Sequence, residues 1–139
     1  MQLILHPLPT TAELSNYSDS IQDVYYLLSE ILDPEFPHTL PELKILRPEK
    51  ISCDDKSVTV IFTPTVPHCS LSTFIGLALR ERLRQVFGGT RKIFVLVEAH
   101  QDAAQLNKQL ADKERVLAAM ENPEIWAVVK NMLTNCKGD

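Results

Sequence analysis

Cys69 is the side chain with the clearest capacity for chemistry in this chain of 139 residues. It ends a proline-rich turn, TPTVPHC at 63–69, between an alternating apolar run at 58–63 and a helical pattern that begins near residue 71. The first amides of a helix are unpaired and carry partial positive charge. A thiol placed there tends to be more ionised and more reactive. The position predicts a reactive or metal-binding thiolate; the alternative is a small apolar side chain that fills space under a helix start.

Two histidines could join Cys69 in a metal site. His68 is its neighbour in the sequence, and His100 follows closely on an apolar run at 93–97. The carboxyl ends of parallel strands gather at one edge of a sheet, so His100 could reach the same edge as Cys69. Two imidazoles and a thiolate suit zinc or iron. The alternative interpretation is two unrelated surface histidines.

The elements that must position these residues can be predicted from hydrophobic patterns. Residues 43–51 and the alternating run at 58–63 predict an antiparallel hairpin, with turn residues at 54–56. The helical pattern after Cys69 ends at Gly88 and Gly89. The continuous apolar run at 93–97 predicts a strand that is buried on both faces and paired in parallel. Strand, helix and strand at this spacing predict a right-handed βαβ crossover.

Further helices flank this unit. Ser20 and Asp23 form a capping-box pattern before a helical stripe that continues to residue 32. A second stripe covers 106–120, and Asn122 with Pro123 predicts the start of a last helix. We expect an α/β (α+β) domain with a three-stranded mixed sheet and about four helices. Residues 1–18 are expected to form a flexible arm, and 19–135 a single domain.

Composition excludes some classes of function. The formal net charge is −4 and the isoelectric point is near 5.5, which argues against a non-specific nucleic-acid binder and gives no reason to expect binding to an anionic membrane. No apolar stretch approaches the length of a membrane span. The number of cysteines is odd, and no two of them have CxxC spacing; they are Cys53, Cys69 and Cys136. A disulfide framework is therefore not expected, and we expect a reducing compartment, the cytosol or the nucleus. Cys53 and Cys136 are expected to be incidental.

Two surface features could contact partners. The segment KQLADKER at 108–115 carries mixed charge, which fits either a solvated helix face or a protein-docking surface. Its candidate contact residues are Lys108, Gln109, Asp112, Lys113 and Arg115. Trp126 lies off the best apolar stripe of the last helix, so it is either part of the core or an exposed anchor for a partner.

Four segments resemble one known family. They are DPE at 33–35 with Pro37 and Thr39–Leu40 after it, FTPTVPHCS at 62–70, IGL at 75–77 and NKQLADKERV at 107–116. The chain is similar in these segments to the MIP-eighteen family, the eukaryotic branch of the PaaD/SufT-like domain, and the resemblance covers about residues 20–135.

The resemblance implies a PaaD/SufT-like α/β domain without enzymatic turnover. Members of this family join a WD40-repeat propeller adaptor and a HEAT-repeat scaffold, and the complex delivers iron–sulfur clusters to apo-proteins in the cytosol. The cysteine of the family's PHC motif is hyper-reactive and needed for function, and that position is Cys69 here. Some members form domain-swapped homodimers, and some hold metal near this motif.

One departure from the family concerns the candidate metal site. The family has a Thr-Pro-Gly-Thr-His-like turn after the second parallel strand and a glutamate shortly after the histidine. Here VEAH stands at 97–100, and the glutamate position falls at Ala103. The change leaves Cys69 intact and weakens the expectation of a metal held by His68 and His100.

A stable [4Fe–4S] centre needs four cysteine ligands, and this chain has three in all. We therefore expect no stably bound cofactor, but a transient iron–sulfur cluster or zinc shared with a partner or a second copy. Two other functions stay open on the residues alone. One is a cysteine-dependent hydrolase or acyltransferase, and the other is a structural interaction module.

Overall fold

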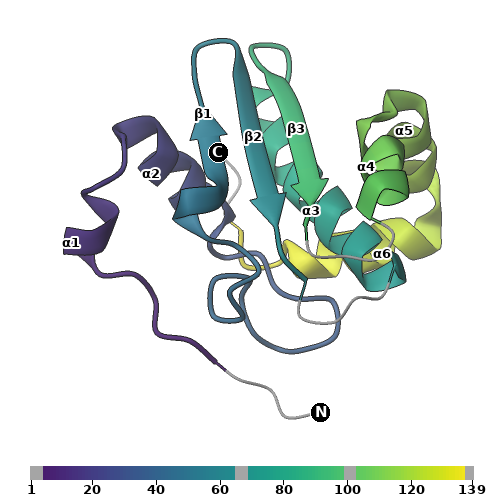
Figure 1. The fold of residues 1–139 in the computed structure, drawn as a ribbon. Helices are drawn as coiled ribbons and strands as arrows, with labels where there is room; N and C mark the ends of the chain where they lie inside the picture. Colours follow the sequence, from purple (N-terminus) through teal and green to yellow (C-terminus); the bar gives the residue numbers. More distant parts are fainter. Residues whose placement is uncertain (1–4, 65–68, 99–102, 137–139) are drawn as a thin grey trace.

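A three-stranded mixed sheet is the centre of the fold (Figure 1). The computed structural model describes residues 5–64, 69–98 and 103–136. The strands β1 (Ile51–Cys53), β2 (Ser57–Phe62) and β3 (Lys92–Val97) lie in the order β1-β2-β3. β1 pairs antiparallel with β2, and β2 pairs parallel with β3. The predicted α+β class, the parallel pairing and an antiparallel hairpin with its turn at 54–56 are confirmed, but the first strand of the hairpin differs from the prediction.

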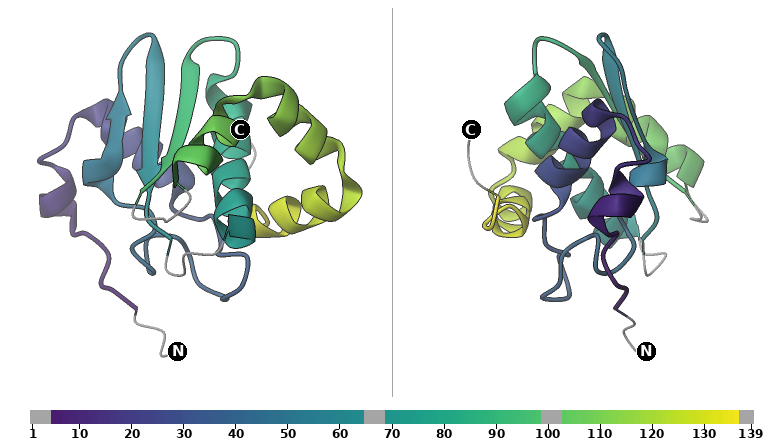
Figure 2. Two further views of the ribbon diagram at one scale, coloured as in Figure 1. Left: turned by 45° about the vertical axis from the view of Figure 1, so that its right-hand side comes forward. Right: turned by 90° about the vertical axis from the view of Figure 1, so that its left-hand side faces the viewer.

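The helices pack mainly on one face and one edge of this sheet (Figure 2). In chain order they are α1 (Thr11–Leu14), α2 (Asp19–Leu28), the short 3-10 helix η1 (Pro48–Lys50), α3 (Cys69–Phe87), α4 (Ala103–Ala111), α5 (Lys113–Glu121) and α6 (Pro123–Met132). α3 connects β2 to β3 and returns antiparallel to them, and α4 lies beside β3 (Figure 1).

The hydrophobic core lies between the sheet and α2 and α3. Alternate residues of β2, namely Val58, Val60 and Phe62, are fully buried on this side, together with Val95 and Val97 of β3. Burial of a whole aliphatic or aromatic side chain contributes about 1.5–3 kcal/mol. This face therefore fixes the register of β2 against β3, because a one-residue slip would turn every buried side chain to solvent.

The prediction that the run at 93–97 is buried on both faces was wrong. β3 is an edge strand in the described part of the chain, and Phe94 is 44% exposed on the face opposite the core. The physical reason is that α4 lies next to the edge of β3 rather than over this second face. Because the run at 93–97 is apolar at every position, its sequence does not alternate between apolar and polar residues. The sequence therefore gave no sign that only one face of β3 is covered.

The prediction of a strand at 43–51 was also wrong. Only Ile51–Cys53 is a strand, and residues 41–46 form turns in which Lys44 has φ 57°. Pro48 stands at the first turn of η1, where its missing N–H costs nothing. Leu43, Ile45 and Leu46 are buried, so their apolar character reflects a packed turn and not a strand.

Two helix boundaries differ from prediction. Ser18 rather than Ser20 caps α2, accepting a hydrogen bond from the Ile21 N–H, and α2 ends at Leu28. The stripe expected over 106–120 is divided at Asp112, which caps α5. The expected arm at 1–18 contains α1, whose Leu14 is only 4% exposed; the domain limits stay a prediction. Among the described residues, no helix is long and apolar enough to cross a membrane.

Candidate functional site

The predicted functional segment begins where the two parallel strands end. Phe62 of β2 pairs with Val97 of β3, so Thr63 and Glu98 leave the sheet side by side. α3 begins at Cys69. The backbone therefore places Cys69 at the first residue of a 19-residue helix, as the sequence predicted, while its side chain lies outside the described part.

The rest of the predicted metal site cannot be compared with the structure. His68 and His100 lie outside the described residues. Within the ranges that are described, no group of three or more His, Cys, Asp or Glu side chains could hold a metal ion. The three-ligand site of His68, Cys69 and His100 thus stays a prediction, as does the reactive role of Cys69.

A cluster of charged side chains ties the two strand ends together. Glu98 Oε1 accepts hydrogen bonds from Thr63 Oγ1 at 2.7 Å and from Arg47 Nη2 at 2.8 Å. Arg47 Nη2 also donates to Thr63 Oγ1 at 3.0 Å, and Lys50 Nζ lies 3.3 Å from Glu98 Oε2. We call Arg47, Lys50, Thr63 and Glu98 the Glu98 cluster. It fixes the last described residues before the segments at 65–68 and 99–102.

The electrostatics of the Glu98 cluster favour ionised Glu98. The hydrogen bond from Thr63 is the largest cause that lowers the pKa of this carboxyl, followed by Lys50 and Arg47. The cluster contains two cationic groups and one anionic group, so it carries excess positive charge. Arg47 Nε is buried and has no hydrogen-bond partner among the described residues. The four residues of the cluster together therefore carry one formal positive charge.

The other two cysteines lie in a different environment. Burial raises the pKa of the Cys53 thiol, although the Arg91 guanidinium, 3.4 Å from its sulfur, acts in the opposite direction. Burial also raises the pKa of Cys136. Since the thiolate is the nucleophile and metal ligand, neither thiol is well placed to react.

The segment at 107–116 has structural as well as surface roles. The side chain of Asn107 bonds both backbone groups of Val97, accepting from its N–H at 2.8 Å and donating to its carbonyl at 3.3 Å. Leu110 packs on α3 at Gly76, where an added Cβ would lie 2.7 Å from Leu110 Cδ1. Asp112 accepts hydrogen bonds from the first amides of α5. Asn107, Leu110 and Asp112 thus have roles within the fold itself, which do not require a binding partner.

The predicted contact residues are mainly on the surface. Lys108, Lys113 and Arg115 are exposed and Gln109 is half-buried, and Arg115 Nε lies 3.8 Å from Asp112 Oδ2. Trp126 is 38% exposed and lines a groove of about 510 Å³ with Leu117 and Met120. Trp126 is thus neither fully in the core nor fully exposed. Partner binding by these residues stays a prediction.

Sequence reasoning missed the Glu98 cluster. Its partners are 35 and 51 residues apart in the chain, and no local pattern links them. The only sequence signal was a glutamate placed directly after an apolar strand. The motif DPE at 33–35 had a local signal: Asp33 Oδ2 accepts hydrogen bonds from the N–H groups of Glu35 and Phe36, both at 2.9 Å, which closes a turn.

Comparisons with known proteins agree with the family resemblance. Residues 21–95 match the model of a family described as iron–sulfur cluster assembly protein. A MIP18 family protein of Schizosaccharomyces pombe is 42% identical over 122 residues, covering 83% of this chain and 68% of that protein.

For two further relatives, the alignment with this chain covers a larger share of the relative. The cytosolic iron-sulfur assembly component 2B of Mus musculus is 40% identical over 134 residues, covering 91% of this chain and 82% of the mouse protein. A MIP18 family protein of Dictyostelium discoideum is 36% identical over 141 residues, covering 85% of this chain and 93% of its own. The chain therefore belongs to the MIP18 family of iron–sulfur cluster assembly proteins.

Proposed function

We propose that this chain is a non-enzymatic component of a cytosolic targeting complex that delivers iron–sulfur clusters to apo-proteins, with Cys69 as the exchangeable ligand. Membership of the family supports the role, since one relative is named a cytosolic iron-sulfur assembly component. The observation that carries the proposal for Cys69 is its position as the first residue of α3. There the helix dipole favours a thiolate.

The chemistry is ligand exchange at iron. The Cys69 thiolate replaces one ligand of a cluster iron, and a thiolate of the client then replaces Cys69, with no change in oxidation state. One suitable thiol per chain fits this transient role better than permanent storage, because a stable cluster needs four cysteine ligands. Zinc bound by the same thiolate with His68 and His100 would be a competing occupant.

The Glu98 cluster supports the same role. Its excess positive charge lies at the end of β2 from which the chain continues to Cys69. Positive charge near a thiol favours the charged thiolate. We therefore propose that Arg47 and Lys50, which Glu98 holds in place, favour the Cys69 thiolate together with the helix N-terminus.

The proposed partners are a WD40-repeat propeller adaptor, a HEAT-repeat scaffold and the apo-protein clients. We place these contacts on the exposed side chains of α4, α5 and α6, among them Lys108, Lys113, Arg115 and Trp126. A homodimer would supply a second Cys69 to the same cluster. The proposed location is the cytoplasm and the nucleus, where such clients act.

The test replaces Cys69 in cells that depend on this chain. Cys69→Ser should abolish most iron incorporation into a client protein, measured as radiolabelled iron in the immunoprecipitated client. Cys53→Ser is the matched control, since burial raises the pKa of that thiol, and it should leave incorporation unchanged. Normal client loading with Cys69→Ser would contradict the proposal. Turnover of activated esters that depends on Cys69 would favour an enzyme instead.

A further inference from the structure

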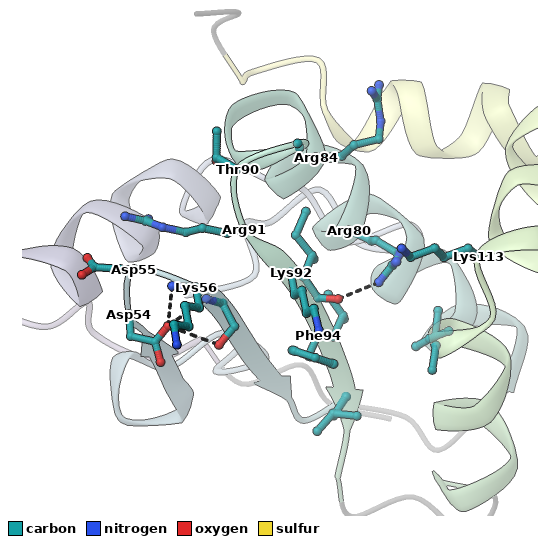
Figure 3. A pocket seen from close by; sticks show the side chains of 18 residues that line it. Asp54, Asp55, Lys56, Arg80, Arg84, Thr90, Arg91, Lys92, Phe94 and Lys113 are labelled. Atoms are coloured by element: carbon teal, nitrogen blue, oxygen red, sulfur yellow. Dashed lines mark hydrogen bonds between the residues drawn. The ribbon is translucent and has the colours of Figure 1, made fainter.

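A large basic groove lies away from Cys69, along β3 and the start of α5 (Figure 3). Its volume is about 1150 Å³. The six cationic side chains that line it outnumber the two carboxylates, Asp54 and Asp55; the cations are Lys56, Arg80, Arg84, Arg91, Lys92 and Lys113. This excess of positive charge occurs in a chain whose net charge is −4. We call this feature the β3 groove.

Most of these cations have no carboxylate partner. Among the ion pairs of the described residues, only that of Arg84 with Glu81 involves a cation of the β3 groove. Arg80 is half-buried and donates to the Ile93 carbonyl at 3.0 Å, and burial lowers its pKa. Burying a guanidinium without an anion is unfavourable. An incoming carboxylate beside Arg80 would relieve this cost.

The open edge of β3 supplies backbone groups to the same groove. The amides of Lys92 and Glu98 point toward the β2 side: they donate to the carbonyl of Lys56, just before β2, at 2.9 Å and to that of Phe62 at 3.0 Å. Successive residues of a strand point their backbone groups to opposite neighbours. The groups of Ile93, Val95 and Val97 therefore face away from β2.

Val95 lines the groove and is only 3% exposed, but its edge-facing backbone groups are left without a partner among the described residues. Asn107 occupies both groups of Val97, and Arg80 occupies the carbonyl of Ile93. No side chain or backbone group of the described residues bonds the edge-facing N–H or carbonyl of Val95. An unpaired strand edge is a template for another extended chain.

Phe94 adds an apolar surface between the charges. It is 44% exposed and lines the groove together with Arg80, Lys92 and Lys113 (Figure 3). A ligand that fills this groove must therefore combine negative charge, apolar side chains and backbone donors and acceptors. An extended peptide has all three, whereas a nucleic acid cannot pair with a strand edge.

We propose that the β3 groove binds an extended acidic peptide segment of a partner protein, which pairs with β3 at Val95 and places its carboxylates against Arg80, Lys92 and Lys113. Because Asn107 blocks the edge at Val97, the added strand covers only the first half of β3. This surface does not include Cys69, so it goes beyond the cluster-delivery function and can fail or succeed independently.

The first experiment measures binding of a fluorescein-labelled seven-residue peptide in which Asp and Glu alternate with Val and Phe. Fluorescence anisotropy with the full chain should show saturable binding, and Lys92→Glu with Lys113→Glu should weaken it about tenfold or more. The matched control is Lys108→Glu with Lys130→Glu, two exposed lysines outside the groove, which should change binding by less than about twofold. Equal losses in both pairs would overturn the proposal.

The second experiment separates strand pairing from charge alone. The same peptide with alternate backbone amides N-methylated keeps every carboxylate and loses half its edge donors and acceptors. It should bind at least about tenfold more weakly, since several backbone hydrogen bonds are lost. The parent peptide should also slow hydrogen exchange of the Val95 amide. Equal binding of the methylated peptide, tighter binding of an oligonucleotide, or self-association through this edge would each overturn the proposal.

The groove and the cysteine are tested independently of each other. Client loading that survives in the single variant Lys92→Glu, which keeps Lys113 for the proposed partner contacts, would leave the role of Cys69 intact. Loss of peptide binding in Cys69→Ser would overturn the groove proposal, because Cys69 does not line the groove.

Discussion

The Glu98 cluster and the β3 groove are both rich in cations, but they differ in how many of those cations are paired. At the strand ends, Arg47 and Lys50 share Glu98, and Thr63 joins the same carboxylate. In the groove, half-buried Arg80 and exposed Lys92 and Lys113 form no ion pair with any carboxylate of the described residues. Paired charges stabilise the fold, whereas unpaired charges are available to a ligand. Substitutions in the Glu98 cluster should therefore lower the stability of the fold, whereas substitutions in the β3 groove should lower the affinity for a ligand.

The largest effect on stability should come from Asn107→Ala, at the border between the two regions. The change leaves the Val97 N–H and carbonyl unpaired, which should lower the free energy of unfolding by about 1–3 kcal/mol. Urea denaturation measures this value. Gln105→Ala, an exposed amide on the same helix, is the matched control and should have little effect. An equal effect of both substitutions would contradict the edge-capping role of Asn107.

Glu98→Ala should have the next largest effect. It removes the acceptor of Arg47 and Thr63 and leaves two cations together, which should cost about 1–2 kcal/mol after allowance for partial exposure. The comparison is Glu81→Ala, which removes the partner of the exposed Arg84 side chain and should cost less than about 1 kcal/mol. If both losses prove equal in denaturant titrations, the Glu98 cluster has no special structural role.

The loss of stability at acidic pH should depend in part on Glu98. Because the folded-state pKa of Glu98 is lowered, its contribution is complete above the unfolded value of about 4.3 and is lost as pH falls through the folded value. Glu98→Gln should therefore flatten the loss of stability between neutral pH and about pH 3. A curve parallel to that of the unmodified chain would exclude this linkage.

The smallest effect is expected in the groove. Replacing Lys92 and Lys113 by Gln removes charges that have no carboxylate partner in the described part of the chain, so the free energy of unfolding should change by less than about 0.5 kcal/mol. Affinity for the acidic peptide should fall in the same variant. Strong destabilisation would show that these lysines support the fold and are not reserved for a ligand.

Much of the scaffold could be predicted from the sequence. The alternation at 58–63, the proline-rich turn and the helix ended by Gly88 and Gly89 fixed β2, α3 and their junction at Cys69. Local patterns failed where apolar residues pack through turns, as Ile45 does, or where a strand carries apolar residues on an open face, as Phe94 does.

The site itself was less predictable than the scaffold. The position of Cys69 at the start of α3 could be predicted because a strand–helix junction is a local feature; its reactive role stays a prediction. The Glu98 cluster depends on contacts between residues distant in the chain, and the open edge at Val95 depends on where α4 packs. Neither has a periodic signal, since both arise only from tertiary packing.

The central claim is that Cys69 is reactive because of its place at the start of α3. The most direct measurement is alkylation of all three cysteines in the native chain, followed in time by mass spectrometry. Cys69 should react about tenfold faster than a free cysteine at neutral pH, and Cys53 and Cys136, whose pKa values are raised by burial, should react more slowly than a free cysteine. A rate for Cys69 no faster than that of free cysteine would contradict the account.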